Sequence, residues 1–271
     1  MNQISPERLT EELVAKALRT TGLGRPARYL PSTASTNLIA HEIARKGANH
    51  GTLVITDYQT HGRGRLERKW LSPPGEDLLF SLILRPAETP AQAFQITATT
   101  SLAVAHAIRR ETGLDAYIKW PNDVYLRDKK VSGILTELGI SGTRLAYAVT
   151  GIGINVNSDP TLHHHLRDIA TSLRRETGGP VDRLSLLTAC LEQLEQFYEM
   201  LKGRGFAALK IMWDALSLIK DRQITITTGD AMHQGVAESV DDDGTLIMRE
   251  QNGTKSRFVY GDVSLGLRGQ G

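Results

Sequence analysis

The pattern of the sequence changes near residue 220. Before this point, short apolar runs alternate with segments of helical periodicity, and after it the chain shows only short strand-like runs separated by turns. A chain of 271 residues is also longer than one hydrophobic core usually supports. We therefore expect two parts: an α/β part over residues 1–220 and a small all-β part over residues 221–271, within the size range of a compact barrel.

The first part is predicted to be α/β, a mixed central sheet with helices packed against it. Ser5 and Ser35 are expected to cap the first two helices, and residues 89–92 have the form of a capping box. Gly47 and Gly113 are expected to end the second and third helices. Turns at 128–129 and 141–143 join consecutive strands, so the sheet contains antiparallel pairs. The expected helices are 5–20, 35–46, 89–113, 184–201 and 206–218, and the expected strands are 53–56, 78–84, a short one after Gly113, 124–127, 131–138, 144–155, 223–227, 234–240, 245–250 and 256–259.

Composition excludes several classes of protein. The chain carries 32 Lys and Arg against 30 Asp and Glu, and this net charge of +2 gives little general attraction to nucleic acid or to a membrane. Its longest nearly apolar stretch, residues 78–84, is far shorter than the roughly 20 residues that cross a bilayer, and the N-terminus lacks a secretion signal. The single cysteine, Cys190, rules out an internal disulfide and a cysteine-based zinc site. We expect a soluble, cytoplasmic protein.

Two further features argue against an RNA-binding surface and against a metal site. Residues 222–271 carry seven acidic and five basic side chains, whereas a barrel that binds RNA should be basic. The run His163-His164-His165 has no cysteine nearby, and consecutive side chains diverge, so we expect a surface run and no metal site.

The strongest local signal is the segment Gly62-Arg63-Gly64-Arg65-Leu66-Glu67-Arg68-Lys69-Trp70, hereafter the basic segment. Four of its side chains are positive and one is negative, so its net charge exceeds that of the whole chain. Its glycines permit a close approach of the backbone to a ligand, and guanidinium groups match phosphate and carboxylate oxygens. The segment is predicted to clamp an anion. A solvated basic turn between two strands is the alternative.

Two other motifs combine rigidity with polar side chains. Lys119-Trp120-Pro121-Asn122-Asp123 follows a short strand, and Pro121 favours a stiff bend there, with Lys130 close behind in sequence. Ligands commonly bind at the strand ends of α/β sheets, although a turn chosen for its geometry is an alternative. Gly151-Ile152-Gly153-Ile154-Asn155 ends an apolar strand. Its spacing does not fit a dinucleotide fingerprint, so we expect glycines that admit a ligand or a neighbouring backbone, with Asn155 as a polar contact.

These motifs together resemble those of the biotin protein ligases. The resemblance runs from about Tyr29 to the C-terminal part and rests on several ordered motifs, which are far more specific jointly than singly. In addition to the segments above, it is carried by Ser35-Thr36-Asn37, Tyr58-Gln59, Lys130, Gly133-Ile134-Leu135 and Ala170-Thr171-Ser172-Leu173.

The resemblance implies a fold, a reaction and a set of residues. The fold is a mixed sheet like that of class II tRNA synthetases, followed by an SH3-like barrel. The reaction activates biotin with ATP and Mg²⁺ as biotinyl-adenylate, then transfers biotin to a lysine of a biotin carboxyl carrier domain. Lys130, Arg65 and Asp123 are implied to be catalytic, with Asp123 orienting the attacking lysine or accepting its proton. The residues implied to bind biotin are Ser35, Thr36, Asn37, Gln59, Gly62, Arg63, Gly64, Arg65, Lys130 and Gly133, and those implied to bind ATP are Arg65, Arg68, Trp70, Lys119, Asn122 and Asn155.

The sequence departs from the family in two places. Glu67 stands where the basic segment usually has a third glycine, which stiffens the segment and adds a negative charge. About 28 residues precede Tyr29, too few for the three-helix DNA reader of many relatives, so we expect no DNA binding. Some relatives form homodimers, which is possible here. A lipoate ligase and a binding protein without catalytic activity remain alternatives, although the chain lacks the three-glycine run of lipoate ligases.

Overall fold

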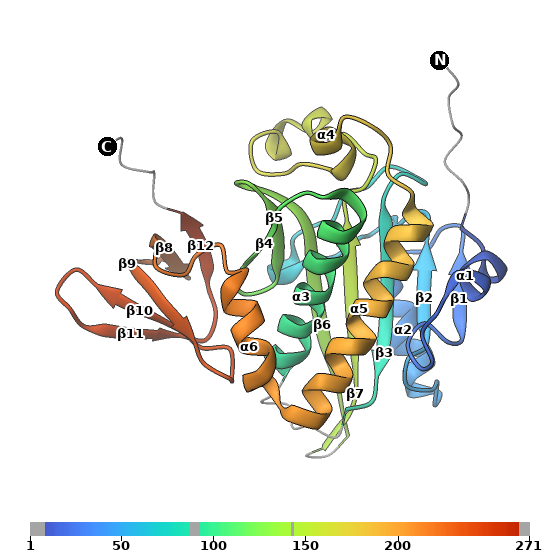
Figure 1. Cartoon of the computed structure of the whole chain (residues 1–271), viewed down its shortest axis with the longest axis horizontal. Helices are drawn as coiled ribbons and strands as arrows, with labels where there is room; N and C mark the ends of the chain where they lie inside the picture. The colour runs from blue at the N-terminus through green and yellow to red at the C-terminus, as the bar shows by residue number, and fades with distance from the viewer. Residues whose placement is uncertain (1–8, 87–92, 142–143, 266–271) are drawn as a thin grey trace.

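The structure is a computed structural model that describes residues 9–86, 93–141 and 144–265 (Figure 1). Its α-helices are α1 (Glu11–Ala17), α2 (Thr36–Arg45), α3 (Ala93–Thr112), α4 (Leu173–Thr177), α5 (Arg183–Arg204) and α6 (Phe206–Ala215), and its short 3-10 helices are η1 (Arg65–Glu67), η3 (Pro160–Leu162) and η4 (His164–Leu166). The strands are β1 (Ala27–Leu30), β2 (Leu53–Thr56), β3 (Leu78–Leu84), β4 (Ala116–Lys119), β5 (Asp123–Leu126), β6 (Lys129–Ser141), β7 (Arg144–Ile154), β8 (Gln223–Thr228), β9 (Ala231–Val240), β10 (Leu246–Glu250), β11 (Lys255–Phe258) and β12 (Asp262–Leu265).

The strands form two separate sheets. The larger has seven strands in the order β1-β2-β3-β7-β6-β5-β4, and only β1 and β2 pair in parallel. The smaller has five antiparallel strands in the order β11-β10-β9-β8-β12. The predicted fold class, a mixed sheet with helices followed by a small β part, is therefore confirmed.

Helices cover the two faces of the large sheet unequally. In Figure 1, α3 and α5 lie side by side across one face, where the main core is buried. Helix α2 packs on the opposite face, with Ala40 and Ala44 against Val54, Ile83 and Val149. Because successive residues of a strand face opposite sides, the fully buried and mostly apolar side chains of β2 and β3 fill both layers. Because α2 is short, it leaves part of this face of the large sheet uncovered beyond its N-terminus. The cavity described below lies there.

The small sheet is attached to the large one through a buried contact. The indole Nε1 of Trp120 donates to the carbonyl oxygen of Gly244 at 2.9 Å, and Trp120 is only 2% exposed. Phe94 of α3 packs so closely on Gly244 that a Cβ there would lie 2.3 Å from the ring. These contacts place β12 and the end of β8 beside the large sheet. None of the described helices is long and apolar enough to cross a membrane.

Several local predictions are confirmed. Gly47 and Gly113 hold the left-handed conformation (φ of 92° and 71°) directly behind α2 and α3. The strands at 53–56 and 78–84 lie where the apolar runs predicted them. The capping box at 89–92 and most of the turn at 141–143 lie outside the described residues.

The first helix differs from its prediction. It begins at Glu11, because the Thr10 hydroxyl accepts a hydrogen bond from Leu13 N and caps the helix, and it ends at Ala17. Leu9 is not helical, so a continuous helix over 5–20 was wrong, and Ser5 lies outside the described residues.

The start of α2 also differs. Ser35 occupies the N-cap position, but its hydroxyl makes no capping hydrogen bond. Instead, the Gln59 Oε1 atom accepts from Thr36 N at 2.8 Å. The prediction that Ser35 caps this helix was wrong, because a side chain from a distant loop takes the role.

Smaller differences concern turns and the last strand. The turn between β5 and β6 is centred on Arg127 and Asp128, one residue earlier than predicted, with Arg127 at a φ of 55°. Helix α6 ends at Ala215, and its C-cap is Leu216. Strands β1 and β12 and helix α4 were not predicted, because each has only four or five residues, too few for a clear periodic signal.

Candidate active site

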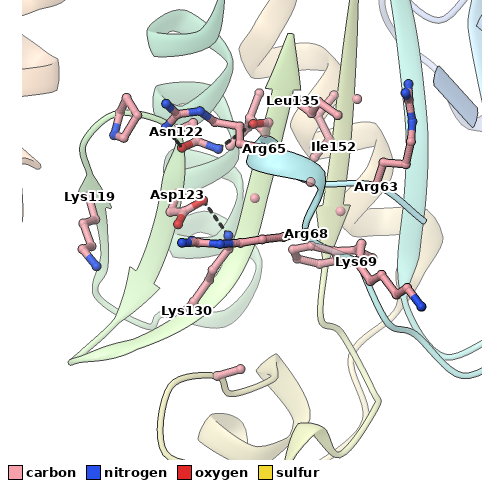
Figure 2. Close-up of a pocket in the computed structure, with 18 of the residues that line it drawn as sticks. Arg63, Arg65, Arg68, Lys69, Lys119, Asn122, Asp123, Lys130, Leu135 and Ile152 are labelled. Carbon is pink, nitrogen blue, oxygen red and sulfur yellow. Dashed lines mark hydrogen bonds and ion pairs between the residues drawn. The ribbon is translucent and has the colours of Figure 1, made fainter. Parts of the chain in front are cut away.

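A cavity of about 580 Å³ opens on the α2 face of the large sheet, a size typical of small-molecule sites (Figure 2). The basic segment, the start of α2, the ends of β4 to β7 and residues 261–264 of the small β part line it. The structure brings together nearly all of the predicted site residues: Ser35, Thr36, Asn37, Gln59, Arg63, Gly64, Arg65, Arg68, Trp70, Lys119, Asn122, Asp123, Lys130, Gly133 and Asn155 line this cavity.

Gly62 is the predicted site residue that does not line the cavity. Its carbonyl accepts from Trp70 N at 2.9 Å, and a Cβ on Gly62 would lie 2.4 Å from the carbonyl oxygen of Trp70. Gly62 therefore closes the base of the basic segment, where the two ends of the segment meet.

Glycines form the floor of the cavity. Gly133 of β6 pairs with Gly153 of β7, and Gly151 lies two residues earlier on the same face. The Trp70 indole lies directly over Gly153, because a Cβ there would be 2.5 Å from its Cε2 atom. A Cβ on Gly151 would likewise lie only 2.1 Å from Asn37 Oδ1, so Asn37 packs directly on this glycine. The predicted close approach at the GIGIN strand is thus made by side chains of the protein itself.

The three arginines of the basic segment reach three different partners. Arg65 donates to Asn122 Oδ1 at 3.0 Å, a contact marked in Figure 2, and burial lowers the pKa of Arg65. Arg68 forms an ion pair with Asp262 of β12. Arg63 points away from these two in Figure 2 and binds Glu137. The segment is therefore pinned to the large sheet on two sides and to the small sheet on a third.

Lys130 is held on several sides at the centre of the cavity. Its Nζ atom lies 2.7 Å from Asp123 Oδ1 and 5.6 Å from the centre of the Trp70 ring. Its backbone N–H donates to the carbonyl oxygen of Ile169, and its carbonyl accepts from Thr171 N. Because Asp123 and Lys130 point at each other across neighbouring strands, the cation is fixed before any ligand binds (Figure 2).

A second lysine lies at the same strand ends. Lys119 Nζ donates to the Tyr125 hydroxyl at 3.1 Å and lies over its ring. Burial lowers the pKa of Lys119, opposed by the charge of Asp123, and burial also raises the pKa of Tyr125. Together with the arginines, these lysines give the cavity a strongly cationic wall suited to phosphate and carboxylate groups.

A chain of hydrogen bonds fixes the start of α2. Gln59 binds Thr36, the Ser81 hydroxyl donates to Asn37 Oδ1 at 2.6 Å, and Asn37 Nδ2 donates to Glu137 and to the carbonyl oxygen of Leu135. Asn37 is 4% exposed. Its amide is fully engaged within the protein, so Asn37 orients its neighbours at this end of the cavity.

Asn155 closes the other end. It is buried, and its side-chain amide donates to the carbonyl oxygen of Thr171 at 3.0 Å. The next residue, Val156, donates its N–H to Asp77, which also accepts from Ser72 just behind the basic segment. Burial raises the pKa of Asp77, against these hydrogen bonds. Asp77 thus ties the end of the basic segment to the end of β7.

The carboxylates near the cavity do not form a metal cage. Within residues 9–86, 93–141 and 144–265, no three His, Cys, Asp or Glu side chains lie together as a metal site would require. The His163-His164-His165 run is exposed, as predicted. Asp123 and Asp262 are the carboxylates that line the cavity, and both are paired with cations.

Sequence reasoning missed several residues of the cavity. Asp262 lies 194 residues from its partner Arg68, and no local pattern signals such a pairing. Ala170 lines the cavity because it bridges to Lys130, and Ile169 lies beside it; the motif Ala170-Thr171-Ser172-Leu173 carried the resemblance, but its residues were not assigned to the site. Tyr125 lies two residues after Asp123 on β5, so its side chain could have been expected on the same face of the sheet.

Comparisons with known proteins match both parts of the chain. The Biotin/lipoate A/B protein ligase family matches residues 29–155, and the Biotin protein ligase C terminal domain matches residues 221–266. The bifunctional ligase/repressor BirA of Bacillus subtilis (strain 168) is 36% identical over 262 residues, which are 96% of this chain and 80% of that protein. The biotin--[acetyl-CoA-carboxylase] ligase of Paracoccus denitrificans is 34% identical, over 81% of this chain and 92% of its own length.

A solved structure agrees with these sequence matches. The biotin protein ligase from Aquifex aeolicus in complex with biotin and ATP superposes with a TM-score of 0.77 at 30% identity, covering 89% of this chain and 98% of its own. These matches cover both sheets and the strands that build the cavity. The chain therefore belongs to the biotin protein ligase family.

Proposed function

We propose that the protein activates biotin with ATP and transfers it to a lysine of a biotin carboxyl carrier domain. In the first step, a biotin carboxylate oxygen bonds to the α-phosphorus of ATP, the bond to the β-phosphate oxygen breaks, and pyrophosphate leaves. In the second step, the lysine amine loses a proton and attacks the carbonyl carbon of the mixed anhydride, and AMP leaves. Both steps require charge stabilisation, because anions meet in the first and an oxyanion develops in each.

The observation that carries this proposal is the position of Lys130. Its ammonium group lies in the cavity between Asp123 and the Trp70 ring, above the glycine floor. A fixed cation at this place can meet the biotin carboxylate and the α-phosphate together without reorganising during the reaction. Arg65, held by Asn122 next to Asp123, can add a second positive charge.

The remaining roles follow from position in the cavity. Ser35, Thr36 and Gln59 lie at the α2 end and suit the ureido ring, since they offer both donors and acceptors. Arg68, Lys119 and Asn155 lie toward the small sheet and the end of β7, and suit the nucleotide. Trp70 offers an apolar wall between them.

Mg²⁺ belongs to the proposal as an ion carried by ATP. Magnesium usually binds phosphates with one or two carboxylates and several waters, and Asp123 and Asp262 are the carboxylates at hand. When bound, the ion offsets the negative charge of the phosphates. The chain's own contribution is the cationic wall of Arg65, Arg68 and Lys130.

The chain divides into two parts in this proposal. Residues 1–220 form the catalytic part and residues 221–271 the C-terminal part, which is supported by a family match that begins at residue 221. A cytoplasmic location is supported by Cys190, a lone buried thiol. Homodimer formation and the absence of DNA binding stay predictions, which sedimentation and a promoter-shift assay test.

The test combines the protein with ATP, Mg²⁺, biotin and a biotin carboxyl carrier domain, and reads the carrier by intact mass. We expect addition of one biotin, and biotin-dependent exchange of pyrophosphate into ATP. Lys130→Ala and Arg65→Ala should lower the exchange about 100-fold or more, as loss of a preorganised charge typically does. Exchange that depends on lipoate would favour a lipoate ligase, and tight biotin binding without exchange would favour a binding protein.

The second step is tested with Asp123→Asn. If Asp123 orients the attacking lysine or accepts its proton, transfer from preformed adenylate should slow by about 100-fold or more, within the range of general-base catalysis. Pyrophosphate exchange by the same variant separates this effect from loss of the Lys130 contact. Transfer at the wild-type rate would exclude the role.

A further inference from the structure

Tyr125 lines the cavity but belongs to none of the predicted site motifs. It lies on β5 two residues after Asp123, which also lines the cavity. The Lys119 Nζ atom lies 4.9 Å from the centre of the Tyr125 ring and donates to its hydroxyl at 3.1 Å. Tyr125 therefore holds one of the cations of the cavity wall in place before any ligand binds.

The hydroxyl of Tyr125 has a proton left to donate. A phenol is protonated near neutral pH, and its oxygen can accept one hydrogen bond while its O–H group donates another. The Lys119 ammonium group has donors only, so the Tyr125 oxygen is the acceptor in their contact. In the part of the chain that the structure describes, no acceptor takes the proton of this hydroxyl. A ligand in the cavity can therefore accept it.

Tyr125 and Lys119 lie on the side of Lys130 that is remote from α2. Helix α2 packs on β2, β3 and β7, whereas Lys130 is on β6, Tyr125 on β5 and Lys119 on β4. These strands follow one another in the large sheet in the order β2-β3-β7-β6-β5-β4. Figure 2 likewise places Lys119 on the far side of Asp123 from Ile152. The pair of Tyr125 and Lys119 thus lies away from the end of the cavity proposed for biotin.

The chemistry of the first step requires donors at this place. In a displacement at phosphorus, the attacking and leaving oxygens lie roughly in line on opposite sides of the phosphorus atom. With biotin at the α2 end and the α-phosphate at Lys130, pyrophosphate leaves toward β5 and β4. Its negative charge builds up on oxygens that accept hydrogen bonds, and an ammonium group beside a hydroxyl donor stabilises such a group.

We propose that Tyr125 binds the leaving group of the first step: its hydroxyl, together with the Lys119 ammonium group, donates to the pyrophosphate part of ATP. This inference rests on the proposed function, and it adds a residue with a role in one step only. Because pyrophosphate has left before the carrier lysine attacks, Tyr125 should have no influence on the transfer of biotin to the carrier.

The test is Tyr125→Phe, which keeps the ring beneath Lys119 and removes only the hydroxyl. In the biotin-dependent exchange of pyrophosphate into ATP, the KM for pyrophosphate should rise about tenfold or more, as the loss of a hydrogen bond to a charged group typically causes. The KM for biotin should not change, because biotin lies at the other end of the cavity. Transfer from preformed adenylate to the carrier should be as fast as in the wild type.

Tyr117→Phe is the matched control. Tyr117 lies opposite Tyr125 on β4, and its side chain is outside the lining of the cavity. The same loss of a hydroxyl there should leave all three measurements unchanged. An unchanged KM for pyrophosphate in Tyr125→Phe would overturn the proposal. Transfer slowed as much as exchange would overturn it too, since that result indicates a structural role.

Binding of magnesium pyrophosphate in the absence of biotin, measured by titration calorimetry, separates this proposal from the proposed function. If the wild type catalyses no exchange, the proposed function fails, and the calorimetry alone decides the role of Tyr125. Binding weakened about tenfold in Tyr125→Phe would then support this role. Equal binding by the two proteins, or no binding by the wild type, would overturn it.

Discussion

Leu66 and Glu67 hold backbone conformations that few residues other than glycine adopt. Their φ angles are 53° and 58°, within the short η1 turn at the tip of the basic segment. A left-handed conformation costs an L-residue roughly 1–2 kcal/mol. Glu67 stands where the family usually has a glycine, so this chain folds the tip of its basic segment against backbone strain.

Glu67→Gly should therefore favour the closed segment. We expect bound adenylate to be lost several-fold more slowly, because about 1 kcal/mol of strain is removed and a negative charge leaves the phosphate side. Glu67→Ala is the control, since it removes the charge and keeps the strain. The dissociation rates of adenylate from both variants measure the two contributions, and equal rates in the two would show that the backbone plays no part.

At the scale of elements, side chains on helices hold loops that have no regular structure of their own. Glu195 of α5 accepts hydrogen bonds from the backbone N–H groups of Thr21, Gly22 and Leu23, at 2.6 to 3.1 Å. This loop leads into β1, so the contact fixes the edge of the large sheet. Burial acts to raise the pKa of Glu195, but these hydrogen bonds outweigh it, and the pKa is lowered.

The contribution of Glu195 should depend on pH. Its carboxylate stabilises the fold at a pH above the unfolded glutamate pKa of about 4.3, and this is lost as the pH falls through the lower folded value. Glu195→Gln should cost about 1–2 kcal/mol at pH 6, and the difference from the wild type should shrink toward pH 3. Urea unfolding at both pH values measures this. A difference that grows in acid would contradict it.

The elements that sequence predicted well are those whose signals are local. Strands β2 and β3 are mostly apolar runs, and Gly113 ends α3 through its own conformation. What sequence missed depends on partners far along the chain: Gln59 caps α2 across 23 residues, and β12 exists because it pairs with β8.

In the candidate site, too, local motifs could be predicted and distant partners could not. The motif residues could be identified one by one, and the fold gathers them because strand ends β4 to β7 meet at one edge of the cavity. Glu137 and Asp262 gave no signal, since each is an ordinary strand residue until Arg63 or Arg68 reaches it. Gly62 was assigned to ligand binding by its motif, whereas sterics place it at the base of the segment.

At the scale of the whole molecule, the two sheets meet through Gly244. Its φ of 91° requires glycine, and Phe94 leaves no room for a side chain. Trp120 then binds its carbonyl oxygen, so one residue of the small β part touches two elements of the large one. The arrangement holds Asp262 where Arg68 can reach it, which makes the closed cavity a property of both sheets.

Gly244→Ala should destabilise the whole molecule. We expect a loss of about 2–4 kcal/mol, from left-handed strain and from the clash with Phe94. Gly253→Ala is the matched control, because Gly253 also has a positive φ (84°) but no atom near its missing side chain. In Gly244→Ala, the urea midpoints measured by tryptophan fluorescence and by far-UV circular dichroism should both fall by the same amount. Equal losses in the two variants would show that the contact with Phe94 contributes nothing.

The glycine floor also limits how this gene can drift. Any single-base change in a glycine codon that alters the amino acid introduces at least a Cβ atom or a stop. At Gly151 and Gly153 that atom would strike Asn37 or Trp70, whereas at Gly179 and Gly203 it would meet open space. A random change of codon is therefore far less tolerable at these two positions of the cavity floor than at Gly179 or Gly203, and the cavity keeps its depth only while both positions carry no side chain.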